Sequence, residues 1–166
     1  MVFLRIVKSV IVATIGLFSC LVAFNNLVDY DSNWAFVRHV LAMDTVFPDN
    51  AVRYRAITAS SIQAAAYWAV IAVEWAVGLV CLYGAWGLWR TRHDRRAYIA
   101  AKAVPAAGLL LAWLLYFVGF LTIGGEWFTM WQSSRWNGQP DAARFLTSCT
   151  LALIVLLLPE SDDATG

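Results

Sequence analysis

The sequence predicts an all-α integral membrane protein, with four transmembrane helices and an extracytoplasmic cap of short amphipathic helices. Three observations lead to this prediction. Hydrophobic residues make up 61% of the 166 residues and charged residues only 14%, whereas soluble domains are about 45–50% apolar and about 25% charged. Four apolar stretches are about as long as the roughly 20 residues that a helix needs to cross a bilayer. Two longer polar connections between them are rich in aromatic residues.

The four expected spans cover residues 6–27, 64–89, 103–123 and 141–158, in one membrane domain of residues 1–166. The first span is entered through Arg5 and Lys8, and the second is broken only by Glu74. The third has Pro105 in its first turn, where the missing N–H of proline costs little. The fourth is short, and Pro159 stops it.

Positive charges are concentrated on one side of the predicted bundle. Seven of the twelve cations precede or enter the first span or lie in the short inner loop 90–102, and the other five lie on the opposite side among most of the acids. Lys and Arg concentrate in short cytoplasmic loops. We therefore expect cytoplasmic termini, with an acidic cytoplasmic tail at 159–166 and outer loops at 28–63 and 124–140.

The first outer loop is expected to contain an amphipathic helix over residues 33–43. At about 100° per residue, apolar side chains that include Trp34 fall on one half of this helix, and Arg38 and His39 fall on the other. Ser32 is a suitable N-cap. Such a helix would lie on the bilayer surface or on the ends of the spans.

The second outer loop is expected to begin where Gly124–Gly125 breaks the third span. A helix from Glu126 would place Trp127, Phe128, Met130 and Trp131 on one side. We expect the two loops to pack on each other as one ordered cap. In this cap Glu126 would contact an arginine or backbone donors of the first loop, and Arg38, Arg53, Arg55 and Arg135 would complement Asp29, Asp31, Asp44 and Glu126.

The stretches FNNLVDYDSNWAFVRHVLAMDTVFPDN (24–50) and GGEWFTMWQSSRWNGQPDAARF (124–145) carry a specific resemblance. They resemble the two signature stretches of a bacterial family of predicted small integral membrane proteins of unknown function. The similarity covers nearly the whole chain and includes the four-span plan; the tail after Leu158 lies outside it. The resemblance implies a topology in a bacterial inner membrane, and it brings no established chemistry.

Glu74 is the one ionisable residue deep inside a predicted span. Such residues are rare and usually face the interior of a helix bundle, so Glu74 should be protonated or paired. Thr14, Trp113 and Tyr116 are its available partners. It is either a link between helices or a group that takes part in a proton or cation step, and the first interpretation is favoured. The residues that share its helical face and should be buried are Tyr67, Ile71, Gly78, Cys81 and Ala85.

Small residues at helical spacing are expected to allow close helix packing within the bundle. In the second span these are Ala65, Ala69, Ala72 and Ala76, and in the third span Gly108, Ala112 and Gly119. The cysteines Cys20, Cys81 and Cys149 share no metal-binding spacing and are expected to be core residues.

The sequence carries no motif for a resident cofactor, and none is predicted. The two histidines, His39 and His93, fall on opposite sides, so one chain cannot provide bis-histidine haem ligation. The run Asp29-x-Asp31-x-Asn33 departs from a calcium loop at its sixth position, Trp34. A looser cation site with Asp44 or Glu126 is less favoured than a local turn.

Taken together, these features favour a non-enzymatic accessory, stabilising or assembly subunit of a larger inner-membrane complex, a respiratory complex being one setting. The expected partners are the lipid bilayer and other membrane-protein subunits, and not nucleic acid. The alternatives are a small oligomeric transporter or channel that uses Glu74, or a quinone- or lipid-binding membrane protein. The candidate binding residues are Glu74, Trp113, Tyr116, Asp29, Asp31, Trp34, Arg38, His39, Asp44, Glu126, Trp127, Trp131, Arg135 and Trp136.

Overall fold

The computed structural model describes residues 2–160, and these form helices without any strand. Four helical rods among the described residues are long and apolar enough to cross a membrane, which confirms the prediction of an all-α protein with four transmembrane helices. In chain order the elements are α1 (Val2–Val28), α2 (Tyr30–Ala42), η1 (Arg53–Arg55), α3 (Ser60–Thr91), α4 (Arg95–Ala101), α5 (Ala103–Leu114), η2 (Leu115–Trp127), η3 (Met130–Gln132) and α6 (Gln139–Leu157).

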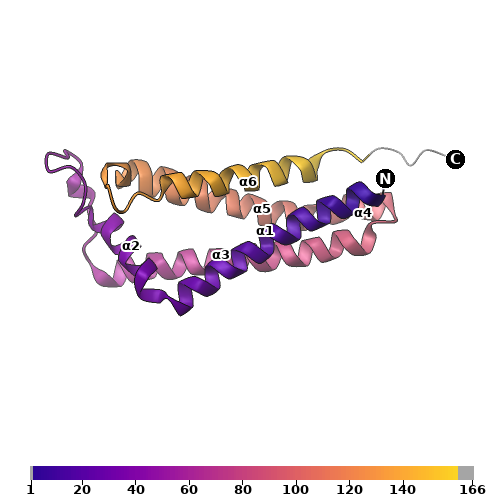
Figure 1. Ribbon diagram of the computed structural model, residues 1–166, viewed down its shortest axis with the longest axis horizontal. Coiled ribbons are helices and arrows are strands. Elements are labelled where there is room, and N and C mark those ends of the chain that lie inside the picture. The colour runs from indigo at the N-terminus through magenta and orange to yellow at the C-terminus, as the bar shows by residue number, and fades with distance from the viewer. Residues whose placement is uncertain (1, 161–166) are drawn as a thin grey trace.

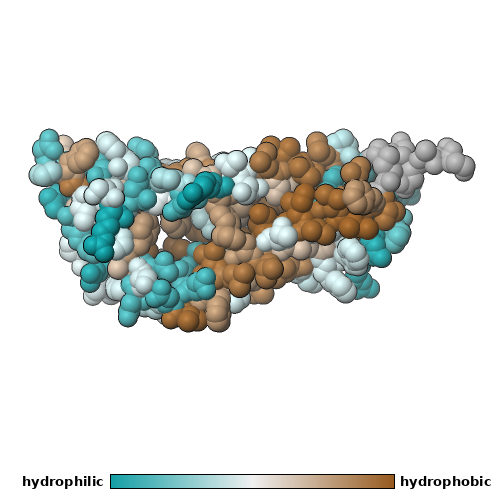
Figure 2. Space-filling view, viewed as in Figure 1, coloured by the Kyte–Doolittle hydropathy of each residue, from teal (hydrophilic) through white to brown (hydrophobic). Residues whose placement is uncertain are grey.

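The bundle is elongated, and its two ends differ in character (Figure 1). The start of α1, the α3–α4 turn and the end of α6 lie at one end, here called the basic end, which carries Arg5, Lys8, Arg92, Arg95 and Lys102. The opposite end, here called the loop end, carries α2 and residues 43–59 and 128–138. Figure 2 shows a largely hydrophobic surface over the rods and a mainly hydrophilic one at the loop end.

Glycines set the close approach of the helices. A Cβ at Gly78 of α3 would lie 2.9 Å from the backbone nitrogen of Cys20, so α1 and α3 cross almost backbone to backbone there. A Cβ at Gly84 would lie 2.7 Å from the nitrogen of Pro105, where α3 meets α5. Gly108 and Ala112 are buried in such contacts, but Ala65, Ala69 and Ala72 are exposed. The expectation that these three alanines pack inside the bundle was wrong, because the buried face of α3 is the opposite one.

The third rod differs from its predicted form near its end. Helices α4, α5 and η2 follow one another, and η2 is a π-helix in which backbone N–H groups reach carbonyls five residues back. Gly124 and Gly125 lie inside η2 and are buried, so they do not end the rod as expected. The N–H of Phe128 still donates to the carbonyl of Ile123, which carries the pattern past Trp127.

Helix α2 follows α1 after a single residue, Asp29. It therefore begins before Ser32, which is not its N-cap; the Ser32 hydroxyl instead donates to Oδ1 of Asp29. The helix ends at Ala42, and the C-cap residue Met43 has a left-handed φ of 49° and donates its N–H to the carbonyl of Val40. Met43 is fully buried, so packing stabilises this conformation.

Two apolar cores result from this arrangement. One runs along the four rods and includes Cys81, Leu109, Cys149 and Leu156. The other lies at the loop end, between α2 and the segment after η2, and its buried members are Val40, Met43, Val46, Phe128 and Met130.

Candidate functional site

A buried polar cluster joins α1 to α3 around Glu74. The side-chain amide of Asn26 donates to Oε2 of Glu74 over 2.6 Å, and the hydroxyl of Tyr67 donates to the backbone carbonyl of Asn26 over 2.9 Å. The hydroxyl of Ser19 donates to the backbone carbonyl of Glu74. Glu74 is 3% exposed, Tyr67 1% and Asn26 8%. The cluster therefore hydrogen-bonds α1 to α3 away from solvent.

The burial of the Glu74 face was predicted correctly, but the partner was not. Tyr67, Ile71, Gly78, Cys81 and Ala85 are all buried. Thr14, however, is exposed and its hydroxyl bonds to the carbonyl of Ile11 in its own helix. Trp113 stacks on Phe117, and Tyr116 packs against Phe120 and Phe145. Asn26 was missed because the offset between α1 and α3, which sets which residues face each other, cannot be read from either span alone.

The two long loops pack on each other at the loop end through neutral hydrogen bonds. Thr45 donates to the hydroxyl of Ser133 over 2.9 Å. The side-chain amide of Asn50 donates to the hydroxyl of Thr129 over 2.8 Å and to Oε1 of Gln132 over 2.7 Å. Residues 43–57 and 128–136, here called the cap, therefore form one packed unit on the ends of the helices.

Aromatic contacts reinforce the cap. Trp136 stacks on His39 with ring centroids 4.7 Å apart and meets Phe36 edge-on. Phe47 meets Trp131 edge-on at 5.9 Å. Phe128 and Met130 are buried, whereas Trp127 and Trp131 are 53% and 47% exposed. The expected apolar side that all four would share does not form, because the chain leaves the helical path after Trp127.

The charged residues of the loops do not pair as expected. Glu126 is exposed, and no hydrogen bond or ion pair of it is found among residues 2–160. The guanidinium of Arg55 instead lies 4.4 Å from the ring centroid of Trp127 and donates to the backbone carbonyl of that residue. The guanidinium of Arg135 likewise lies over the ring of Trp136, 5.0 Å from its centroid. These arginines stack on tryptophan faces, where cation–π attraction replaces the expected ion pairs.

The remaining candidates are spread over the loop end. Trp34 packs on Tyr30 and Tyr67, next to the Glu74 cluster. Asp44 accepts from Nδ1 of His39 at 2.8 Å. Asp31 and Arg38 are exposed. Within residues 2–160, no three His, Cys, Asp or Glu side chains lie close enough together to hold a metal ion, so Asp29, Asp31, Asp44 and Glu126 do not converge there.

An apolar cavity of about 280 Å³ lies beneath α2. Its walls come from α2, from the first turns of α3 and from η2, and they include Phe36, Val40, Ala69, Gly119 and Phe128. His39 and Glu126, two of the candidate binding residues, do not line this cavity.

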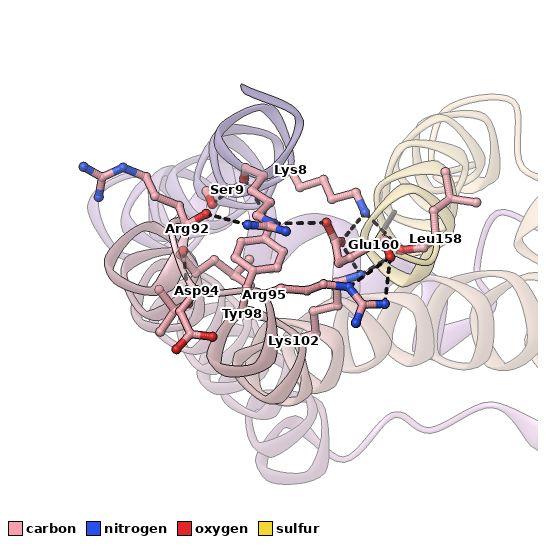
Figure 3. A network of polar contacts seen from close by, with 12 residues as sticks. Lys8, Ser9, Arg92, Asp94, Arg95, Tyr98, Lys102, Leu158 and Glu160 are labelled. Atoms are coloured by element: carbon pink, nitrogen blue, oxygen red, sulfur yellow. Dashed lines mark hydrogen bonds and ion pairs between the residues drawn. The ribbon is translucent and has the colours of Figure 1, made fainter. Parts of the chain in front are cut away.

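The basic end holds a second buried polar network (Figure 3). Nζ of Lys8 and Nζ of Lys102 each lie 2.6 Å from Oε1 of Glu160, and each also donates to the backbone carbonyl of Leu158. Arg5 Nε lies 3.5 Å from Oε2 of the same carboxylate. Glu160 is 9% exposed, Lys8 7% and Lys102 8%. Three cationic side chains from α1 and the α4–α5 junction therefore meet a residue that follows α6.

Further bonds extend this network along the basic end. Arg95 donates twice to the backbone carbonyl of Glu160. The hydroxyl of Tyr98 donates to the carbonyl of Arg5, and Arg5 donates to the carbonyl of Arg92. The sequence had suggested that Glu160 lies in an acidic tail, of which residues 161–166 fall outside the described part. An acid directly after a span, on the side where the cations gather, was the signal that could have suggested this pairing.

The electrostatics of Glu160 follow from these contacts. Burial favours the neutral carboxyl and by itself would raise the pKa of Glu160. The hydrogen bonds from Lys102 and Lys8, together with their charges, outweigh burial and hold the pKa below its ordinary value. Glu160 is therefore ionised at neutral pH, as an ion pair with two lysines requires.

Comparison with known proteins agrees with this architecture. Residues 4–159 match the model of the family described as "predicted small integral membrane protein (DUF2165)", a family of unknown function. The chain belongs to this family. No curated protein matches the chain, and no solved structure matches it. The family match includes every residue of the Glu74 cluster and the cap, and it ends one residue before Glu160.

Proposed function

We propose that the chain is a non-enzymatic accessory, stabilising or assembly subunit of a larger complex in the bacterial inner membrane, with both termini in the cytoplasm. The observation that supports this best is the exposed face of α3, opposite the face buried around Glu74. This face carries Ala65, Trp68, Ala69, Ala72, Leu79, Tyr83 and Trp86, all exposed. The orientation follows from the cations gathered at the basic end.

The loop-end half of this face has the composition of a helix-docking surface. Ala65, Ala69 and Ala72 recur at helical spacing beside Trp68, which is 51% exposed. Small residues let a second transmembrane helix approach closely, and aromatic residues are enriched at protein interfaces. The apolar cavity opens beside these alanines, since Ala69 is part of its wall. A partner helix that packs on this surface would cover the cavity as well.

The contacts of Glu74 favour a structural role. Its carboxyl accepts from Asn26, and Asn26 in turn binds Tyr67, so the described bonds join two helices of the same chain. A transporter or channel in which Glu74 couples ion movement is the alternative, and it would require an assembly of several copies. A lipid- or quinone-binding role is the other alternative, and the apolar cavity is the observation that favours it.

Site-specific photo-crosslinking in intact cells tests the proposal. A crosslinking residue at Ala72 should give one discrete adduct with a different membrane protein, and Ala69→Trp should abolish it by blocking the close approach. The matched control is Leu151 on α6, 57% exposed, which should give lipid adducts only. Lipid adducts alone at both positions would refute a docking role for α3. An adduct with a second copy of the chain would favour the oligomeric transporter instead.

A further inference from the structure

The basic end of the bundle combines cations with an apolar groove. Lys8 and Lys102 are each more than nine-tenths buried, come from different rods and converge on a single carboxylate oxygen. Arg5 and Arg95 join them and make further contacts of their own. Among residues 2–160, Glu160 is the acid in ion-pair contact with this cluster. At the two lysines, the cluster is thus built around one carboxylate oxygen.

The anion that now fills the cluster is not held within a helix. Helix α6 ends at Leu157, and Leu158 has an extended backbone, with φ −50° and ψ 138°. Glu160 reaches the lysines from the irregular segment that follows, as Figure 3 shows. A carboxylate on such a segment can leave and return without disrupting the packing of the rods. An external anion with the same charge and oxygen acceptors could then take its place.

An apolar groove of about 190 Å³ lies directly beside the cluster, between α1 and α6. Leu4 and Val7 form one side, Val155 and Leu158 the other, and Lys8 and Glu160 belong to its wall. Leu4 and Leu158 are 53% and 51% exposed, so the groove opens to the outside of the bundle. In a bilayer that surface faces acyl chains.

The cationic cluster and the apolar groove together favour one kind of ligand. A soluble phosphate could use the lysines but would gain nothing from the groove, and a neutral lipid could use the groove but would not complement the cations. Anionic phospholipids are attracted to basic clusters at the ends of transmembrane helices. We propose that this site binds one anionic phospholipid, with its phosphate at Lys8 and Lys102 in exchange for the Glu160 carboxylate and an acyl chain in the groove between α1 and α6.

Native mass spectrometry of the full chain in detergent, with added phosphatidylglycerol or phosphatidylcholine, tests this proposal. One phosphatidylglycerol should be retained in preference to phosphatidylcholine. Lys8→Gln should weaken the retention by about fivefold, the effect of losing one cation near a lipid phosphate. Val155→Trp should weaken it by filling the groove. Arg96→Gln is the matched control, since Arg96 lies exposed at the same end, and it should bind like the unmodified chain.

Glu160→Gln keeps the test decisive even if Lys8→Gln does not fold. Removing the competing carboxylate should strengthen phosphatidylglycerol binding, whereas a purely structural network would only lose stability. Unchanged or weaker binding in Glu160→Gln would overturn the exchange. Equal retention of both lipids would overturn the anionic site. Displacement of the lipid by millimolar inorganic phosphate would show that the groove contributes nothing, and the phospholipid assignment would fall.

Discussion

The side-chain amide of Asn26, near the end of α1, donates to the Glu74 carboxyl in the middle of α3 over 2.6 Å. Both groups are buried. An amide donor satisfies a carboxyl oxygen whether that carboxyl is ionised or protonated. The pair can therefore hold the two helices together without a second charge in the apolar interior.

Substitutions at Glu74 should distinguish the contribution of its hydrogen bond to stability from the contribution of its charge. Glu74→Gln retains an oxygen acceptor for Asn26 and should change the free energy of unfolding little. Glu74→Leu leaves the Asn26 amide without its partner and should cost about 1 kcal/mol or somewhat more. Unfolding in mixed micelles measures both. Thr14→Val, which removes an exposed hydroxyl on α1, is the control.

The double variant Asn26→Leu/Glu74→Leu should be more stable than the sum of the two single losses predicts, because no polar group is then left unpaired. Strict additivity would show that the two residues are not coupled. A loss of ion flux in folded Glu74→Gln, reconstituted in liposomes, would support the transport alternative.

The crossing of α1 and α3 should tolerate no side chain at Gly78. Gly78→Ala puts a Cβ within 2.9 Å of the backbone of Cys20, so the helices must separate, at a cost of about 1–3 kcal/mol. Gly87 lies on the same helix, and a Cβ added there would meet nothing within 4 Å. Gly87→Ala should leave the unfolding free energy unchanged or raise it slightly. Equal effects of the two substitutions would contradict the close crossing.

Acid should weaken the basic-end network. The folded pKa of Glu160 lies below its unfolded value. The ionised carboxylate therefore stabilises the fold above its unfolded pKa of about 4.3, and this contribution disappears as the pH falls through the folded pKa. The stability difference between the unmodified chain and Glu160→Gln should be constant from pH 7 to about pH 5 and should then decline. A difference that persists undiminished below both pKa values would argue against an ionised Glu160.

The cap should behave as one unit in hydrogen exchange. Asn50→Leu removes the two bonds that join it to Thr129 and Gln132. Amide exchange should then accelerate in residues 43–57 and also in residues 128–136. Thr58→Ala, at an exposed position next to the cap, should leave both segments unchanged. Faster exchange in the first segment alone would mean that the loops are not coupled.

The proposed orientation predicts opposite labelling of the two ends. In a chain without its native cysteines, Ser134→Cys at the loop end should react with a membrane-impermeant maleimide in intact cells. His93→Cys at the basic end should react only after the cells are opened. Both positions are exposed on the protein surface, so a difference in labelling reports which side of the membrane each position faces. Labelling of His93→Cys alone would invert the topology.

The features that could be predicted from the sequence were those that depend on one helix alone. Hydropathy predicted the four rods, and helical periodicity predicted the buried face of α3 from Tyr67 to Ala85. Contacts between helices depend on how far one helix is shifted along its neighbour and on the angle at which the two cross. Neither quantity can be read from the sequence of a single span. For this reason Asn26 was missed as the partner of Glu74, and Glu160 was assigned to a tail.

Local rules also failed where tertiary packing outweighs them. Gly124–Gly125 has the composition of a helix end, yet both residues are buried inside η2. A Cβ at Gly124 would meet the side chain of Met130, and one at Gly125 that of Gln139, so other chain segments lie directly against both glycines. At the loop end, Arg55 and Arg135 were expected to pair with acids, but their guanidinium groups lie over the rings of Trp127 and Trp136 instead.

Unequal helix lengths have a consequence for how the molecule sits in its membrane. Helix α3 has 32 residues and α6 has 19, which correspond to about 48 Å and about 28 Å. The lysines at the basic end hold the end of α6 beside α1 and the α4–α5 junction, and α3 also extends beyond the start of α6 at the loop end (Figure 1). A hydrocarbon core about 30 Å thick matches α6 alone. The first turns of α3 and the cavity beside α2 would then stand at the level of the lipid head groups, and a thicker bilayer would draw them into the acyl layer.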